Sequence, residues 1–161
     1  MKNLLIAATL LIALAGCQNA KRTQSNNVTQ DAMEQSQEKP AIEKLLFSYR
    51  DALNTSNVNK VLPLYTSDGV FMPSNAPSAV GQVQVKASYE FVFSQIQLNI
   101  EFNIDEIVVN GDYAFARTTS KGTTLIHANG QTVAEENREL FVLQKTDGQW
   151  KIIRYMFNKM K

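Results

Sequence analysis

Cysteine and histidine are nearly absent from this chain, which has one of each in 161 residues, Cys17 and His127. After Cys17 the chain can therefore form no internal disulfide and offers no thiol nucleophile. Zinc and iron sites draw on several histidine and cysteine ligands, which a single histidine does not supply. The sequence thus predicts no metal site.

A charge excess is also lacking, because 16 lysines and arginines face 15 aspartates and glutamates. Residues 1–16 contain Lys2 and no acid, so the chain from Cys17 onward has 15 residues of each sign. Proteins that bind nucleic acids need a basic surface to neutralise phosphates. We therefore expect no nucleic-acid partner.

The chain has no uncharged apolar run long enough to span a bilayer, which takes about 20 residues. Its run at residues 4–16 follows Lys2 and ends in small residues, as the hydrophobic region of a secretory signal peptide does. The letters LAGC at residues 14–17 resemble a bacterial lipobox. The resemblance implies cleavage before Cys17 and a diacylglyceryl anchor on that cysteine. The alternative is an ordinary signal peptide, residues 1–16, with a chance cysteine after it.

A lipid on Cys17 predicts a location in the bacterial cell envelope. In a Gram-negative cell it favours the outer membrane, facing the periplasm; otherwise it favours the outer face of the cytoplasmic membrane. Residues 17–39 are mainly Gln, Asn, Ser, Thr and Lys, with few large apolar residues. Such a segment buries too little surface to offset its ordering entropy, so we expect a flexible tether there.

Residues 40–161 have the length of one domain and open with three predicted helices. Pro40 suits a first helical turn, and the apolar residues after it share one helical face: Ile42, Leu45, Leu46, Tyr49 and Leu53. A short second helix is capped by Asn57 and limited by Pro63. A third helix follows Gly81 and carries an apolar stripe: Val85, Tyr89, Val92 and Ile96.

The apolar period changes to two from Ile100 onward, which is typical of strands. A short strand is expected at 69–72, and an alternating strand at 100–109 with a bulge or strand end near its last residues. The turn sequences NGD, HANG and TDGQ separate further strands at 113–126, 131–145 and 150–158. This order predicts an α+β fold with the helices on one face of a curved antiparallel sheet.

Three stretches carry a family resemblance: SYRDALNTSNVNKVLPLYTSDGVFMPSNAPSAVG at 48–81, AFARTTSKGT at 114–123 and RELFVLQKTDGQWKIIRYMFN at 138–158. They resemble the nuclear transport factor 2-like superfamily, in its SnoaL-like branch, and the last looks like small SgcJ/EcaC-type proteins. The resemblance implies a cone-shaped, cystatin-like fold with an apolar pocket at its open end, and frequent homodimers through the outer sheet face. The chain has no cofactor motif, so we expect no cofactor.

Ketosteroid isomerase, one enzyme of this superfamily, uses an oxyanion tyrosine, a protonated acid and a carboxylate base. By resemblance, its oxyanion tyrosine falls on Tyr49, a second hydrogen-bonding tyrosine on Tyr89 and the protonated acid on Glu139. Its general base falls at about Pro73. Proline cannot remove a proton, so the resemblance supplies the oxyanion-binding residues of the isomerase but not its general base.

The residues themselves leave several roles open. Tyr49 and Tyr89 either line the pocket or only pack in the core. Glu139 alternates with Arg138 on a strand, so one of the two faces inward. An inward Glu139 is expected to pair with Tyr49, and the alternative is a cross-strand ion pair with Arg117. The candidate ligand-binding residues are Tyr49, Met72, Tyr89, Asn137, Glu139 and Tyr155.

Three functions fit these observations. The first is a membrane-tethered domain that binds a small apolar molecule in its pocket. The second is an isomerase, cyclase or hydrolase that uses Glu139 as acid or base together with Tyr49. The third is a dimeric interaction module of the cell envelope. The proline at position 73 favours the first.

Overall fold

The computed structural model describes residues 18–160. The chain divides into two compact units, Met1–Glu34 and Gln35–Lys161. The described part of the first unit, residues 18–34, is helical, and the sheet and the candidate site described below belong to the second unit. The predicted signal peptide and Cys17 lie outside the described residues, so both stay predictions.

Helix α1 (Gln18–Asn54) begins far earlier than the sequence predicted. Residues 17–39 were expected to be a flexible tether and Pro40 to open the helix, but the helix begins at Gln18 and Pro40 lies inside it. Residues 18–39 contain no glycine or proline, and their glutamines, lysines, glutamates and alanines are good helix formers. A single interior proline removes one backbone donor and does not end a helix that tertiary contacts support.

The predicted apolar face of α1 is confirmed, since Ile42, Leu46 and Tyr49 are fully buried. Helix α2 (Val58–Val61) starts as predicted at Asn57, whose side chain accepts a hydrogen bond from the Lys60 backbone N–H. Pro63 then lies in a 3₁₀ turn, η1 (Leu62–Leu64), which leads into the sheet.

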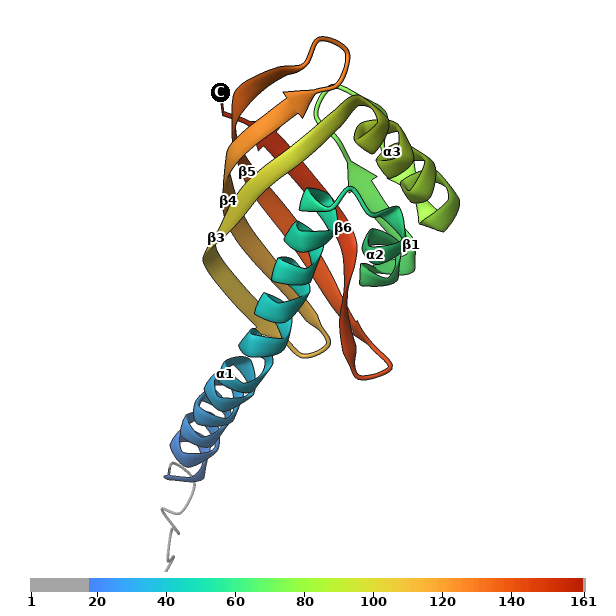
Figure 1. Ribbon diagram of the computed structural model, residues 1–161. Helices are drawn as coiled ribbons and strands as arrows, with labels where there is room; N and C mark the ends of the chain where they lie inside the picture. Colours follow the sequence, from blue (N-terminus) through green and yellow to red (C-terminus); the bar gives the residue numbers. More distant parts are fainter. Residues whose placement is uncertain (1–17, 161) are drawn as a thin grey trace, which may run out of the picture. The chain divides into compact units, whose positions relative to one another are not determined.

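The sheet has six strands in the order β2-β1-β6-β5-β4-β3 (Figure 1). In chain order they are β1 (Tyr65–Met72), β2 (Ala79–Val80), β3 (Ile96–Asn110), β4 (Tyr113–Ile126), β5 (Gln131–Thr146) and β6 (Gln149–Lys159), and α3 (Gly81–Gln95) follows β2. The antiparallel meander from β3 to β6 is confirmed. The sheet as a whole is mixed, however, because β1 pairs with β6 in parallel.

All three predicted turns join antiparallel neighbours. The expected bulge lies slightly earlier than predicted, at Asp105, where the β3–β4 register shifts. Gly122 in β4 faces Ile100 in β3, and a Cβ there would lie 2.1 Å from the Asn99 carbonyl oxygen. Only glycine lets these two strands approach so closely.

The edge of β3 is closed by the end of α1. The Asn54 side chain donates to the Ile100 carbonyl oxygen at 2.8 Å and accepts from the Ile100 N–H at 2.9 Å. One amide side chain thus replaces the partner strand that β3 lacks at this point.

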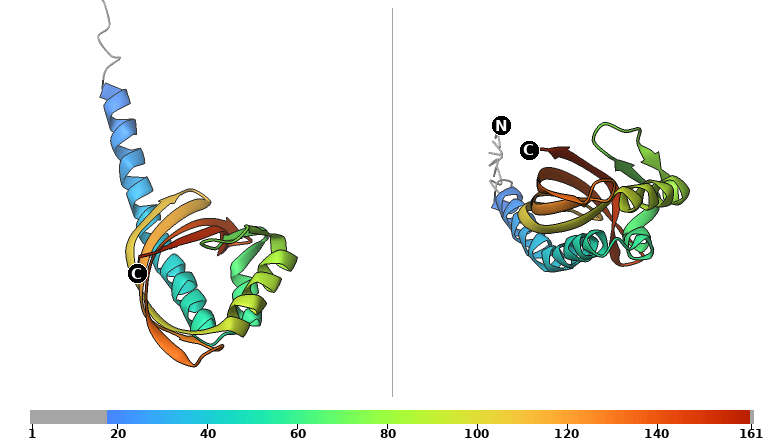
Figure 2. Two further views of the ribbon diagram at one scale, coloured as in Figure 1. Left: turned by 90° about the horizontal axis from the view of Figure 1, so that it is seen from above. Right: turned by 45° about the horizontal axis from the view of Figure 1, so that its top comes forward.

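Strands β3 to β6 curve, and α3 lies beside β1 (Figure 2). The core fills the inner side of this curve with residues from all three α-helices and all the long strands. The SnoaL-type prediction of helices on one face of a curved sheet is therefore confirmed.

Candidate functional site

A cavity of about 280 Å³ lies inside the second unit. Its walls come from α1, β1, α3, β3, β5 and β6, together with the loop after β1. Aromatic and aliphatic side chains dominate, among them Leu53, Phe71, Val92 and Phe157. Drug-sized ligand pockets span roughly 300–1,000 Å³, so this cavity suits a small molecule.

Three buried tyrosines form a hydrogen-bonded chain at the cavity. The Tyr49 and Tyr89 hydroxyls are 2.5 Å apart, and the Tyr89 and Tyr65 hydroxyls are 2.8 Å apart. Three hydroxyls carry three hydrogens, and the two bonds use two of them. When the bonds run from Tyr65 toward Tyr49, the third hydrogen is on Tyr49, which lines the cavity. In this direction the Tyr49 hydroxyl can donate either to the Tyr155 hydroxyl, with which it also interacts, or to a ligand oxygen.

Burial sets the protonation of these tyrosines. It raises the pKa of Tyr49, Tyr65 and Tyr89 well above the usual value, because a phenolate away from water is poorly solvated. The same holds for Tyr155. All four stay protonated at neutral pH and keep their hydroxyl hydrogens.

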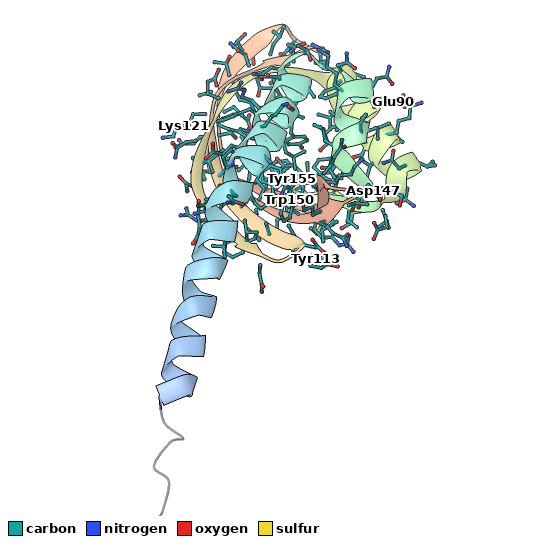
Figure 3. The ribbon with its side chains drawn as sticks, turned by 90° about the horizontal axis from the view of Figure 1, so that it is seen from below. Glu90, Tyr113, Lys121, Asp147, Trp150 and Tyr155 are labelled. Atoms are coloured by element: carbon teal, nitrogen blue, oxygen red, sulfur yellow. The ribbon has the colours of Figure 1, made fainter. Side chains whose placement is uncertain are left out.

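Contacts between aromatic rings fix the positions of the hydrogen-bonded tyrosines. The Tyr155 ring stacks on Phe141, with centroids 4.5 Å apart, and meets Tyr49 edge-on at 5.2 Å. Phe71 stacks on Tyr89 at 4.7 Å. Figure 3 shows Tyr155 on the inner side of the sheet, whereas Lys121 points away. Such ring pairs stabilise by about 0.5–1.5 kcal/mol each beyond their buried area.

Glu139 faces the cavity from β5 and is 4% exposed. Its carboxylate accepts a hydrogen bond from the hydroxyl of Thr118, its direct partner across the β4–β5 ladder. Burial raises the pKa of Glu139, while hydrogen bonds from Thr118 and Ser120 oppose the rise.

Asn137 lies two residues before Glu139 on the same face of β5 and is 6% exposed. Its Nδ2 donates to Glu135 Oε1 at 3.0 Å and to Ser120 Oγ at 3.4 Å. Its Oδ1 is buried and has no hydrogen-bond partner. Asn137, a residue of the cavity wall, thus has a buried acceptor without a donor.

The sequence of this chain matches a known domain family. Residues 47–153 match the family model of the SnoaL-like domain. The chain belongs to the SnoaL-like domain family. A ketosteroid isomerase-like protein from Erwinia carotovora atroseptica is 32% identical, with a TM-score of 0.75 over 77% of this chain and 97% of that one.

More distant structures share the fold of this SnoaL-like domain. A nuclear transport factor 2-like superfamily protein from Salmonella enterica is 20% identical, with a TM-score of 0.69 over 77% of this chain and 92% of that one. A cystatin-like domain of unknown function from Nostoc punctiforme is 16% identical, with a TM-score of 0.63 over 77% and 78% of the two chains. None of the curated proteins matches the chain.

Five of the six residues proposed from the sequence line the cavity of this SnoaL-like domain: Tyr49, Tyr89, Asn137, Glu139 and Tyr155. Met72 does not, because its neighbour Phe71 takes the inward position of β1 and successive strand residues alternate. Pro73 lines the cavity where the resemblance places a general base.

Neither of the two predicted partners of Glu139, Tyr49 and Arg117, is its hydrogen-bond partner in the structure. Tyr49 bonds to Tyr89 instead, and Arg117 points to the other face, where it pairs with Asp105 at 3.0 Å and Glu106 at 3.7 Å. The cross-strand neighbour of Glu139 is Thr118, one residue beyond Arg117, so the side chains at 117 and 139 lie on opposite faces.

Tyr65 was missed as a member of the tyrosine chain. It starts β1, directly after the 3₁₀ turn, where the sequence predicted no strand yet. Tyr65 is followed by Thr66, Ser67, Asp68 and Gly69, so no apolar alternation marked the start of the strand.

Two further features concern residues 18–160 of the SnoaL-like chain. No helix among them is both long and apolar enough to cross a membrane. They also contain no group of three or more His, Cys, Asp or Glu side chains arranged to hold a metal ion. His127 is exposed in its turn, and its Nδ1 lies 3.0 Å from the Ser94 carbonyl oxygen.

Proposed function

We propose that this SnoaL-like domain binds a small, largely apolar molecule that carries an oxygen acceptor. The observation that carries the proposal is the cavity, in which apolar walls surround the end of the tyrosine chain. Burial of the apolar part supplies affinity, at roughly 25 cal/mol for each Å² removed from water. A hydrogen bond from Tyr49 to the ligand oxygen supplies orientation.

The proposal is tested by mass spectrometry of the full chain, purified under non-denaturing conditions and then denatured to release small molecules. Val92→Phe places a larger ring in the cavity wall, whereas Val83→Phe makes the same change at a side chain of α3 that is 83% exposed. We expect a released molecule from the wild type and from Val83→Phe, and none from Val92→Phe. Equal recovery from all three chains contradicts the proposal.

An acid–base enzyme is the second candidate, of isomerase, cyclase or hydrolase type. It is favoured by the position of Glu139, whose buried carboxyl with a raised pKa faces the cavity rather than an arginine. Pro73 limits the chemistry, since it cannot accept a proton from carbon. In this candidate Glu139→Gln keeps ligand affinity and loses turnover. A variant that turns over the isolated ligand at the wild-type rate rules the candidate out.

The lipid anchor remains part of the proposal. We infer from LAGC at residues 14–17 that the domain is tethered to the cell envelope through Cys17. Partitioning with Triton X-114 tests this: the wild type should enter the detergent phase and Cys17→Ser should stay in the aqueous phase. Aqueous behaviour of both contradicts a lipid on Cys17.

We also propose a homodimer through the outer sheet face. Leu140 and Met156 are neighbours across β5 and β6, and are 38% and 40% exposed. Phe115, 38% exposed, lies on β4. Sedimentation should show a dimer for the wild type and a monomer for Leu140→Glu, with Val83→Glu as control. A monomeric wild type contradicts this proposal.

A further inference from the structure

The free acceptor on Asn137 is held in one orientation by its neighbours. A carboxylate only accepts hydrogen bonds, so Glu135 requires the donor end of the Asn137 amide, which fixes Nδ2 toward Glu135 and Oδ1 away from it. Glu135 is itself fixed, because Thr124 Oγ1 donates to its Oε2 at 3.0 Å and Lys159 Nζ lies 3.3 Å from the same oxygen.

This arrangement is costly without a partner. The Asn137 side chain lines the cavity at 6% exposure, and its Oδ1 has no protein donor. A buried polar atom without a hydrogen bond destabilises the folded state, and most buried polar atoms are satisfied. Turning the amide around would only move the problem, since Oδ1 would then face the Glu135 carboxylate. A donor that enters the cavity relieves this cost.

The neighbouring polar groups do not supply that donor. The Thr118 and Ser120 hydroxyls both donate to Glu139, and the Ser120 oxygen accepts from Asn137 Nδ2. The tyrosine hydroxyls bond to one another. The acceptor therefore has no donor among these neighbouring groups.

We propose that the ligand of this cavity carries an N–H or O–H group that donates a hydrogen bond to Oδ1 of Asn137. The inference rests on the proposed binding function and adds a second polar point to it. The ligand class is then a small apolar molecule with an acceptor oxygen near Tyr49 and a donor group near β5. Simple hydrocarbons and molecules with acceptors alone would leave Asn137 unsatisfied.

The test uses two probes of the same bicyclic shape, indole and benzofuran, which differ in having a ring N–H or a ring oxygen. Calorimetric titration of the full chain should show that indole binds about tenfold more tightly, as one added hydrogen bond provides. Asn137→Leu keeps the side-chain size and removes the acceptor, so the two probes should then bind alike. Ser88→Ala removes another polar group of the cavity wall and should keep the preference.

Each result bears on the inference. Equal affinities in the wild type, or a preference for indole that survives Asn137→Leu, overturn the donor inference and leave the binding function standing. Binding of neither probe to the wild type overturns both. A structure of the wild type with indole provides a check that does not depend on the variant folding. We expect the indole nitrogen within hydrogen-bond distance of Asn137 Oδ1, and a nitrogen that points elsewhere overturns the inference.

Discussion

Glu139 and Thr118 face each other across the β4–β5 ladder, and the threonine hydroxyl donates to the carboxylate. The pair lies on the inner face of the sheet, where both residues are buried. The hydroxyls of Thr118 and Ser120 compensate only part of the lost hydration of a carboxylate. Glu139 therefore lies in the cavity wall at a cost to the stability of its charged form.

The first prediction concerns pH. Burial raises the pKa of Glu139 in the folded state above the ordinary 4.5. At a pH between 4.5 and the pKa of the folded state, the folded chain therefore binds more protons than the unfolded chain. Stability should then fall as pH rises from 4.5 through the pKa of the folded state, and level off above it. Glu139→Gln should lack this decrease. The measurement is the free energy of unfolding by urea as a function of pH, for both chains.

The matched control for this prediction is Glu106→Gln, an exposed acid on β3. It should keep the wild-type dependence on pH. A wild-type curve that parallels that of Glu139→Gln would show that the buried carboxyl has no raised pKa.

The second prediction concerns the middle of the tyrosine chain. Tyr89→Phe removes a hydroxyl that bonds to both Tyr49 and Tyr65, and leaves two buried hydroxyls without that partner. We expect a loss of about 1–3 kcal/mol in the free energy of unfolding, measured with urea. Tyr113→Phe, at a tyrosine that is 51% exposed, should change it by no more than about 0.5 kcal/mol. Equal, small effects of both substitutions would argue against a structural role for the chain of hydroxyls.

The third prediction concerns the contact between α1 and the β5–β6 hairpin. Glu38 accepts hydrogen bonds from Lys145 Nζ at 2.6 Å and Trp150 Nε1 at 2.7 Å. Because Trp150 is the only tryptophan, tryptophan fluorescence reports on the surroundings of this one indole. Glu38→Ala should shift the emission to longer wavelength, since water reaches the indole, and should lower the stability by about 1.5–3 kcal/mol.

Glu43→Ala, an exposed position on the same helix, serves as the control. The hydrogen bonds from Lys145 and Trp150 lower the pKa of Glu38, so its stabilising effect is present above pH 4.5 and lost as pH falls. This sign is opposite to that of Glu139. Unchanged emission in Glu38→Ala would show that the contact is absent in solution.

Features that depend on local sequence were predictable. The turns at NGD, HANG and TDGQ, the buried face of α1 and the stripe with Tyr89 all follow from residue types and their spacing. The placement of Tyr49 and Tyr89 at the cavity followed from the family resemblance together with these stripes.

Features set by distant contacts were not predictable. Ile152 and Ile153 are both apolar, so the sequence left the inner face of β6 open; the register shift between Ile152 and Arg154 brings Trp150 and Ile152 inside before it and Tyr155 after it. The parallel pairing of β1 with β6 joins segments far apart in the chain. The partner of Glu139 depended on the β4–β5 register, which no local pattern specified.

The central claim is that the cavity lined by the tyrosine chain takes up a small apolar molecule. The most direct measurement is the dissociation constant of indole for three full-length chains: wild type, Val92→Phe and Val83→Phe. We predict similar affinity for the wild type and Val83→Phe, and affinity at least about tenfold weaker for Val92→Phe, a difference of 1.4 kcal/mol. Equal affinity of all three chains would place the bound molecule outside the cavity and contradict the claim.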